Sequence, residues 1–182
     1  PHLTAVPSIV ALADVSLNSE LEIIRTINEE AGKQGRVHRI IIMIELGDLR
    51  EGILPGSLVN FYGQIFELDH IEMLGIGANL GCLSGAVPNV DQLMQLVLYR
   101  ELLELKFGKP LPIISAGSSA VLPLLLEGRV PKAINHFRIG EALFLGTDLV
   151  NGDHLQGLRT AVTLSAEIAE IKEKNLVPMG ET

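Results

Sequence analysis

Cysteine is almost absent from this sequence: Cys82 is the single one among 182 residues. One thiol forms no internal disulfide and provides no metal-binding cysteine pair, so we expect a protein of a reducing compartment, the cytoplasm. Positive charge is also scarce, because 14 lysine and arginine residues face 22 aspartate and glutamate residues, for a formal net charge of −8. Nucleic-acid binding requires clustered basic residues, so we expect no nucleic-acid partner.

Long hydrophobic runs are missing as well. A run such as Ile40–Ile44 is far shorter than the roughly 18 residues of a membrane helix, so we expect no membrane association. No G-x-G-x-x-G motif opens a helix after the first expected strand, which argues against a dinucleotide-binding fold. The histidines His38, His70 and His136 lack the spacing of metal ligands, and we assign no metal.

Apolar runs are plentiful and regularly spaced in a chain that is 47% hydrophobic. We expect parallel strands, buried on both faces, at Val6–Ala13, His38–Leu46, Ile71–Ile76, Leu111–Ser115 and Ile134–Ile139. Helical patterns lie between them at Glu20–Ala31, Pro55–Glu67, Asp91–Lys106 and from Ser118 to Glu127, and 14–19 is expected to be a capping loop. This rhythm predicts an α/β protein with a parallel sheet, either a barrel or a doubly wound sheet, and we favour the barrel.

The pattern changes after Thr147. A turn is expected at 151–153, and Leu158–Lys174 fits an alternating strand as well as a helix. Periodicity does not decide between the two.

Polar groups collect at the ends of the expected strands. Parallel strands place such ends on one face, where α/β proteins carry their sites. The candidates are Arg50, Asn79, Ser118 with Ser119, and Arg138 with Gly140. Each has a structural alternative: a loop arginine, a turn asparagine, helix-capping serines, and an arginine paired with a buried carboxylate. For Cys82 the structural interpretation is a small buried side chain.

Five segments together resemble a known family, the alanine-racemase-like pyridoxal-phosphate proteins, nearest to their ornithine racemase branch. They are, in order, SLNSELEIIRTINEEAGKQG, HRIIIMIELGDLREGI, GIGANLGC, PIISAGSSAVLPLL and INHFRIGEALFLG. The resemblance covers nearly the whole chain. It implies a (β/α)8 TIM-type barrel followed by a β-domain, a homodimer, and inversion of the α-carbon of a small amino-acid substrate.

The resemblance also implies roles for individual residues around pyridoxal 5'-phosphate. Arg138 would face the pyridine nitrogen. Arg50, at the family's G-x-x-R spacing, would lie by the phenolic oxygen and the substrate carboxylate. The cofactor-binding set would be Ser118, Ser119, Gly140, Glu141, Asn79 and Arg138, with Ser119 and the backbone of Gly140 and Glu141 at the phosphate.

The family's Schiff-base lysine lies on the first barrel strand, upstream of these segments, and its second base is a tyrosine that would follow Thr182. None of the six lysines of this chain falls at an expected strand end. We therefore expect residues 1–150 to be a partial, cofactor-binding barrel, five of its eight units, and 151–182 to be a linker and first strand of the β-domain. The opening at Pro1 instead of methionine fits such a piece. Two alternatives are a non-catalytic pyridoxal-phosphate-binding barrel and a fragment that serves assembly only.

Overall fold

A single parallel sheet organises the computed structural model of this chain, which describes residues 1–173. Its order, β1-β2-β3-β4, follows the chain, and the strands are β1 (Val15–Asn18), β2 (His38–Met43), β3 (Ile71–Ala78) and β4 (Ile113–Ala116). The α-helices are α1 (Val6–Leu12), α2 (Leu21–Lys33), α3 (Leu58–Ile65), α4 (Val90–Phe107), α5 (Leu122–Leu126) and α6 (Glu141–Leu145). Short 3₁₀ turns are η1 (Leu3–Ala5), η2 (Pro55–Ser57) and η3 (Ser119–Val121).

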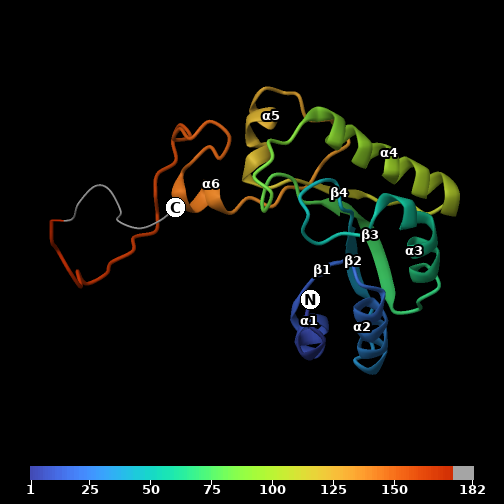
Figure 1. Ribbon diagram of the computed structural model, residues 1–182. Helices are drawn as coiled ribbons and strands as arrows, with labels where there is room; N and C mark the ends of the chain where they lie inside the picture. Colours follow the sequence, from blue (N-terminus) through green and yellow to red (C-terminus); the bar gives the residue numbers. More distant parts are fainter. Residues whose placement is uncertain (174–182) are drawn as a thin grey trace, which may run out of the picture.

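Strands that are consecutive in sequence are neighbours in the sheet, and the order never reverses. A doubly wound sheet reverses its order at a switch point, whereas a barrel adds each βα unit beside the last. Helices α2, α3 and α4 follow β1, β2 and β3 and flank the sheet in turn (Figure 1). The expected α/β fold with a parallel, barrel-type sheet is confirmed.

The main core lies between the sheet and these helices. β2 contributes Ile40 and Ile42, which are fully buried. They point to the same face of the sheet because they are alternate residues of a strand. They pack in one cluster with side chains from α2, α3 and α4, which include Ile24, Leu58, Tyr62, Ile65, Leu93, Leu96 and Leu103. The three expected amphipathic helices are therefore real, and their apolar stripes are what the sheet buries.

The close approach of β3 to β4 depends on glycine. A Cβ atom built on Gly75 would lie 1.9 Å from the carbonyl oxygen of Ile113, its partner in the sheet. Any side chain there would collide with the backbone of the neighbouring strand. The register at this point therefore requires glycine.

The expected strand Val6–Ala13 is wrong, because Val6–Leu12 is the helix α1. Pro7 stands in its first turn, where the missing N–H costs nothing, and Val6 and Val10 are buried one turn apart against Ile27 and Ala31 of α2. The first strand lies instead within the segment that we expected to be a capping loop. Its sequence, VSLN, alternates polar and apolar residues and forms no apolar run.

The expected strand Ile134–Ile139 is also wrong as a regular strand. His136 makes one isolated parallel bridge with Ser115, and the neighbouring backbone bonds join His136 to Ile114 and Ala116. The side chain of Asn135 occupies the next ladder position, because its Oδ1 accepts the Ile114 N–H at 3.0 Å. The segment thus follows the edge of β4 without forming a fifth strand.

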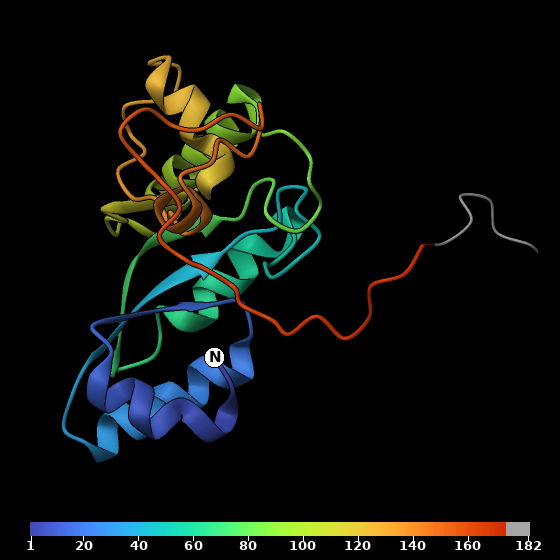
Figure 2. The same cartoon turned by 90° about the vertical axis from the view of Figure 1, so that its left-hand side faces the viewer.

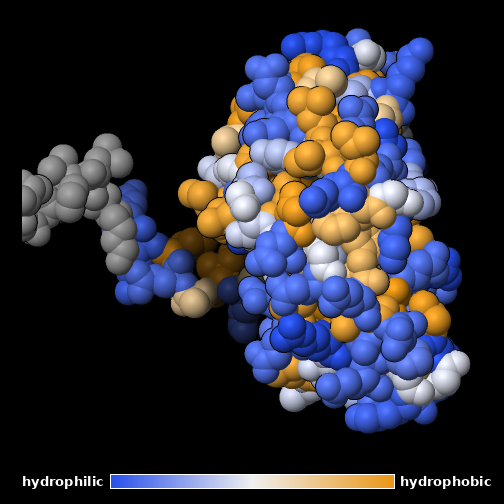
Figure 3. Space-filling view, turned by 90° about the vertical axis from the view of Figure 1, so that its right-hand side faces the viewer, coloured by the Kyte–Doolittle hydropathy of each residue, from blue (hydrophilic) through white to orange (hydrophobic). Residues whose placement is uncertain are grey.

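The last stretch of the described chain, which ends at residue 173, runs away from the body of the molecule (Figure 2). In the segment Leu158–Lys174, residues 158–173 form neither of the expected alternatives, helix or strand, and Lys174 lies outside the described part. The space-filling view shows more hydrophobic surface in the upper half of the molecule, which contains α4, than in the lower half, which contains α2 (Figure 3). Exposed apolar residues of α4 are Met94, Leu98, Leu102 and Leu105.

Between residues 1 and 173, no helix has both the length and the apolar character needed to span a membrane.

Candidate active site

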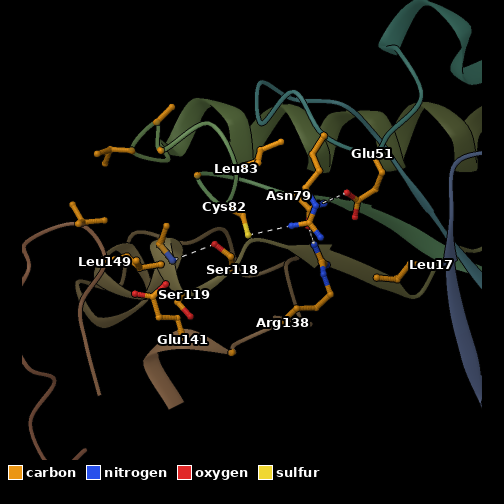
Figure 4. A pocket seen from close by; sticks show the side chains of 18 residues that line it. Leu17, Glu51, Asn79, Cys82, Leu83, Ser118, Ser119, Arg138, Glu141 and Leu149 are labelled. Carbon is orange, nitrogen blue, oxygen red and sulfur yellow. Dashed lines mark hydrogen bonds and ion pairs between the residues drawn. The ribbon is translucent and has the colours of Figure 1, made fainter. Parts of the chain in front are cut away.

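The carboxyl ends of the strands surround one cavity of about 520 Å³. Every site residue expected from the sequence lines it: Arg50, Asn79, Ser118, Ser119, Arg138, Gly140 and Glu141. Arg138 and Asn79 lie together toward one end, and Ser118, Ser119 and Glu141 lie toward the other (Figure 4). The expectation that these strand ends form a single pocket is confirmed.

The loop after β2 carries Arg50 and is shaped by one carboxylate. Glu45 accepts hydrogen bonds from the N–H groups of Gly47 at 2.5 Å, Leu49 at 3.1 Å and Arg50 at 3.2 Å. Leu49 adopts a positive φ of 54°, a conformation that a non-glycine residue keeps only when its surroundings hold it there. The hydrogen bonds to Glu45 stabilise this conformation and fix the backbone position of Arg50.

A second carboxylate ties this loop to the loop after β3. Asp48 is 1% exposed, and its Oδ1 accepts the N–H groups of Leu83 at 2.8 Å and Ser84 at 3.1 Å. A buried carboxylate is costly without hydrogen-bond donors, and Asp48 finds its donors in the other loop. These bonds therefore hold the two loops together. The walls contributed by Arg50 and by the 79–87 loop therefore form one unit.

The guanidinium of Arg50 has two partners in the cavity. Its Nε pairs with Oε2 of Glu51 at 2.7 Å, and its Nη1 donates to Sγ of Cys82 at 3.1 Å. Cys82 is exposed, so the expectation of a buried structural cysteine is wrong. The preceding residue, Gly81, also lines the cavity and has a φ of +67°.

Arg138 is held by neutral oxygen atoms. Nη2 donates to the Ala78 carbonyl at 2.9 Å and to Oδ1 of Asn79 at 2.6 Å, and Nη1 donates to the hydroxyl of Ser115. That hydroxyl also bonds to Nδ1 of His136 at 2.7 Å. Within the described residues Arg138 has no ion pair, so the alternative of an arginine neutralised by a buried carboxylate is not what the structure shows.

The surroundings of Arg138 disfavour its charge. Burial lowers the pKa of the guanidinium from its ordinary value, the carboxylate of Glu51 opposes this, and the nearby Arg50 lowers the pKa further. An arginine still remains protonated at neutral pH, with donors only. Two cationic groups, Arg50 and Arg138, thus share this end of the cavity. The carboxylate of Glu51 pairs with Arg50 and also favours the charge of Arg138.

The two serines at the end of β4 differ in their bonding. Ser118 caps η3, because its Oγ accepts the Ala120 N–H at 3.2 Å while donating to the Leu80 carbonyl at 3.0 Å. Ser119 is 3% exposed, and its Oγ accepts the Ala142 N–H at 3.1 Å. Ser118 is therefore a structural cap, whereas the Ser119 hydroxyl donates to no acceptor within residues 1–173.

The backbone beside Ser119 supplies further donors. The hydrogen bonds of residues 1–173 include none donated by the N–H groups of Gly140 or Glu141. A Cβ atom on Gly140 would meet nothing within 4 Å, so there is open space at this position. Two N–H groups and a hydroxyl therefore surround one corner of the cavity, a donor set suited to a phosphate.

Sequence reasoning missed Glu51, Leu17 and Leu149, all of which line the cavity. Glu51 follows Arg50 directly, and an adjacent pair of opposite charges at a strand end was the available signal. Leu17 belongs to the strand that was mistaken for a loop, so no signal marked it. Residues 1–173 contain no cluster of three His, Cys, Asp or Glu side chains that could hold a metal ion.

Fold and site together define a barrel-type protein whose cavity, at the carboxyl ends of its strands, has a corner of hydrogen-bond donors and a wall that carries two arginines. Residues 4–148 match the family described as alanine racemase, N-terminal domain, and the chain belongs to that family.

Two curated relatives extend the match. An ornithine racemase of Acetoanaerobium sticklandii is 38% identical over 183 residues, covering 100% of this chain and 52% of that protein. A lysine racemase of Thermotoga maritima is 34% identical over 169 residues, covering 92% of this chain and 47% of that protein. The chain thus spans about half the length of the curated relatives it matches.

Solved structures share the fold. PipY of Synechococcus elongatus, with PLP bound, has a TM-score of 0.68 at 17% identity and covers 79% of this chain and 66% of its own. An alanine racemase of Clostridium difficile has a TM-score of 0.66 at 20% identity and covers 88% of this chain and 42% of its own. At these identities the likeness establishes the fold alone.

Proposed function

We propose that this chain is the cofactor-binding part of a pyridoxal-phosphate-dependent amino-acid racemase that interconverts L- and D-amino acids by two-base proton transfer. One observation carries the proposal: Arg138, Asn79, Ser119 and Gly140 converge on one cavity in a member of the alanine racemase family. Both curated relatives are named for amino acids with a terminal amine, ornithine and lysine. We therefore propose a basic amino acid as the substrate.

The residues of the cavity fit the proposed cofactor. Asn79 is 6% exposed, yet its Nδ2 has no partner within the described chain, so a buried donor awaits an acceptor. The N–H groups of Gly140 and Glu141 and the hydroxyl of Ser119 supply donors for a phosphate, beside open space. Arg138 would then face the pyridine nitrogen of the cofactor, and Arg50 or Asn79 would face its phenolic oxygen.

Pyridoxal phosphate, when bound, supplies an electron sink that makes the α-proton of an amino acid acidic. Arg138 limits that sink, because a guanidinium with donors only would leave a facing ring nitrogen unprotonated. The hydrogen bonds from Arg138 to Ala78 and Asn79 hold the guanidinium in this orientation. Arg50 would bind the α-carboxylate of the substrate, and Glu51 holds Arg50 by its 2.7 Å contact.

The two bases would come from other parts of a longer protein. No lysine of residues 1–173 lines the cavity, which agrees with a cofactor-anchoring lysine on a preceding strand. We propose a boundary near residue 150 between the barrel and a following β-domain, and the family match to residue 148 supports it. We further propose a cytoplasmic homodimer, as the family resemblance implies.

A cavity that no lysine of residues 1–173 lines is equally compatible with a second candidate, a barrel that binds pyridoxal phosphate without turnover. One experiment separates the two. The protein encoded by the complete gene is incubated with pyridoxal phosphate and L-ornithine in deuterium oxide, and the products are resolved by chiral chromatography and mass spectrometry. Racemase activity predicts D-ornithine with deuterium at the α-carbon. Cofactor binding without any D-isomer, for ornithine, lysine or alanine, would leave the non-catalytic candidate.

A further inference from the structure

Ser115 contacts Arg138 and His136 at the same time. The hydroxyl of Ser115 accepts a hydrogen bond from Nη1 of Arg138, and it lies 2.7 Å from Nδ1 of His136. The isolated bridge between residues 115 and 136 brings these side chains together, and Ser115 is fully buried. Neither Ser115 nor His136 lines the active-site cavity. The pair can therefore act on a ligand of the cavity through Arg138.

The contact to Ser115 complements the other anchors of Arg138. Ala78 and Asn79 both accept hydrogen bonds from Nη2. Within residues 1–173, Nη1 bonds to Ser115 alone, at the hydroxyl and, across 3.4 Å, at the carbonyl oxygen, a distance at which a hydrogen bond is weak. A guanidinium held at Nη2 only could turn about that nitrogen, whereas a bond at Nη1 fixes the plane of the group. The orientation of Arg138 therefore depends on the Ser115 hydroxyl.

The hydrogen positions follow from a count of donors and acceptors. A serine hydroxyl has one proton and two lone pairs, and Arg138 only donates, so it occupies one lone pair. If Nδ1 of His136 carried a proton, the hydroxyl proton of Ser115 would have no acceptor within residues 1–173. A buried donor without an acceptor is unfavourable, so Ser115 donates to an unprotonated Nδ1. His136 is therefore neutral, with its proton on Nε2.

The charges around His136 agree with this assignment. Much of the residue is exposed, but Nδ1 lies against buried Ser115, and this desolvation lowers the pKa of His136 below its ordinary value of 6.5. The positive charge of Arg138 lowers the pKa further. No carboxylate within residues 1–173 pairs with His136 to oppose these effects. The neutral form is thus the dominant form at neutral pH.

From these contacts we infer that Ser115 and His136 are positioning residues, which hold the guanidinium of Arg138 against the ring nitrogen of the cofactor. The inference rests on the proposed racemase function. His136 takes the hydroxyl proton of Ser115, so that a lone pair of Ser115 faces Nη1 of Arg138. Without this acceptor the hydroxyl can rotate, and the guanidinium is held less firmly. A less firmly held guanidinium limits the electron sink less, so transamination increases relative to racemisation.

The test uses the complete protein, loaded with pyridoxal phosphate and incubated with L-ornithine. Ser115→Ala removes the hydroxyl, and His136→Leu removes its acceptor. His136→Asn keeps an acceptor, because an asparagine Oδ1 is bonded to Cγ as Nδ1 is. We expect the first two variants to raise the ratio of transamination to racemisation about three- to tenfold, and His136→Asn to keep the wild-type ratio. Ser57→Ala, at an exposed serine that makes no capping bond to α3, is the control and should leave the ratio unchanged.

A second measurement does not depend on activity. Nitrogen NMR of isotope-labelled histidines in the complete protein shows which ring nitrogen carries the proton, and the signal absent from His136→Asn belongs to His136. We expect the proton on Nε2. A proton on Nδ1 at neutral pH would overturn the inference, as would an unchanged product ratio in Ser115→Ala or equal ratios in His136→Leu and His136→Asn.

Failure of the proposed function is a separate result. If the wild type racemises no amino acid, nitrogen NMR of bound pyridoxal phosphate, labelled at its ring nitrogen, replaces the product ratio. Protonation of that nitrogen at a pH higher by about half a unit to one unit in Ser115→Ala and His136→Leu, but not in His136→Asn, would support the positioning pair. Any other pattern, including equal values in all variants, would reject it.

Discussion

Nη2 of Arg138 donates to Oδ1 of Asn79 across 2.6 Å, joining two residues that lie 59 positions apart in the sequence. The bond sets the orientation of the Asn79 amide, because an oxygen facing the guanidinium leaves Nδ2 as the free donor. One arginine thus selects which end of a neighbouring amide is offered to a ligand.

This relationship gives the first prediction. Asn79→Asp keeps an acceptor for Arg138 and removes the donor, so pyridoxal phosphate should bind about tenfold more weakly. Asn60→Asp, at an exposed position of α3, makes the same chemical change outside the cavity and should have no effect. Absorbance titration measures both affinities, and equal affinity of Asn79→Asp and wild type would show that Nδ2 has no role.

The second prediction concerns the choice of reaction. Arg138→Glu should retain the cofactor, since the phosphate corner is unchanged, while transamination increases relative to racemisation. A carboxylic acid at this position can share a proton with the ring nitrogen and strengthen the electron sink, whereas a guanidinium cannot. Arg129→Glu, at an exposed residue paired with Glu127, is the control. Product analysis that finds the same racemase activity and the same products in Arg138→Glu would remove Arg138 from the mechanism.

A third prediction tests the packing of the sheet. Gly75→Ala should lower the free energy of unfolding by about 3 kcal/mol, because its Cβ would meet the Ile113 carbonyl and backbone does not move aside cheaply. Gly56→Ala, in η2, meets nothing within 4 Å and should change stability by less than about 1 kcal/mol. Urea denaturation of both variants gives the comparison. Similar midpoints would mean that β3 and β4 are farther apart than described.

A fourth prediction follows from His38, which is 3% exposed and bonded through Nε2 to the Ser16 hydroxyl at 2.9 Å. Burial, and then the charge of Arg39, lower the pKa of His38 below its ordinary value of 6.5. The unfolded chain therefore binds the proton more readily, so stability is intact above pH 6.5 and falls as the pH drops below it.

Replacing this histidine should flatten that dependence. We expect the unfolding free energy of His38→Asn to fall less steeply between pH 6.5 and pH 5 than that of wild type, by at most about 1.4 kcal/mol per pH unit. Part of the slope should persist, because burial also lowers the pKa of His136. Parallel pH profiles for the two proteins would show that His38 does not contribute.

Much of this architecture could be predicted from sequence because its signals are local. The run at β2 is apolar enough to specify a strand buried on both faces, and the glycines at 77 and 81 mark the strand end that carries Asn79. The spacing of leucines on α4 likewise identified a helix. Each of these patterns reflects the element's own burial.

The failures share a different physical origin. β1 is a strand because β2 pairs with it, and the hydroxyl of its buried residue Ser16 bonds to His38 and accepts from Nδ2 of Asn18. The segment 134–139 fails as a strand because the Asn135 side chain replaces a backbone bond. Glu51 became a site residue through the folding of two loops around Asp48. These outcomes depend on tertiary partners, which periodicity does not report.

The central claim is that this cavity holds pyridoxal phosphate in one orientation. A crystal structure of the complete protein with the cofactor tests it most directly. The account predicts the phosphate against the Ser119 hydroxyl and the N–H groups of Gly140 and Glu141, with the ring nitrogen within hydrogen-bond distance of Arg138. A phosphate bound by Arg50 and Arg138 instead, with Ser119 bonded only to Ala142, would contradict it.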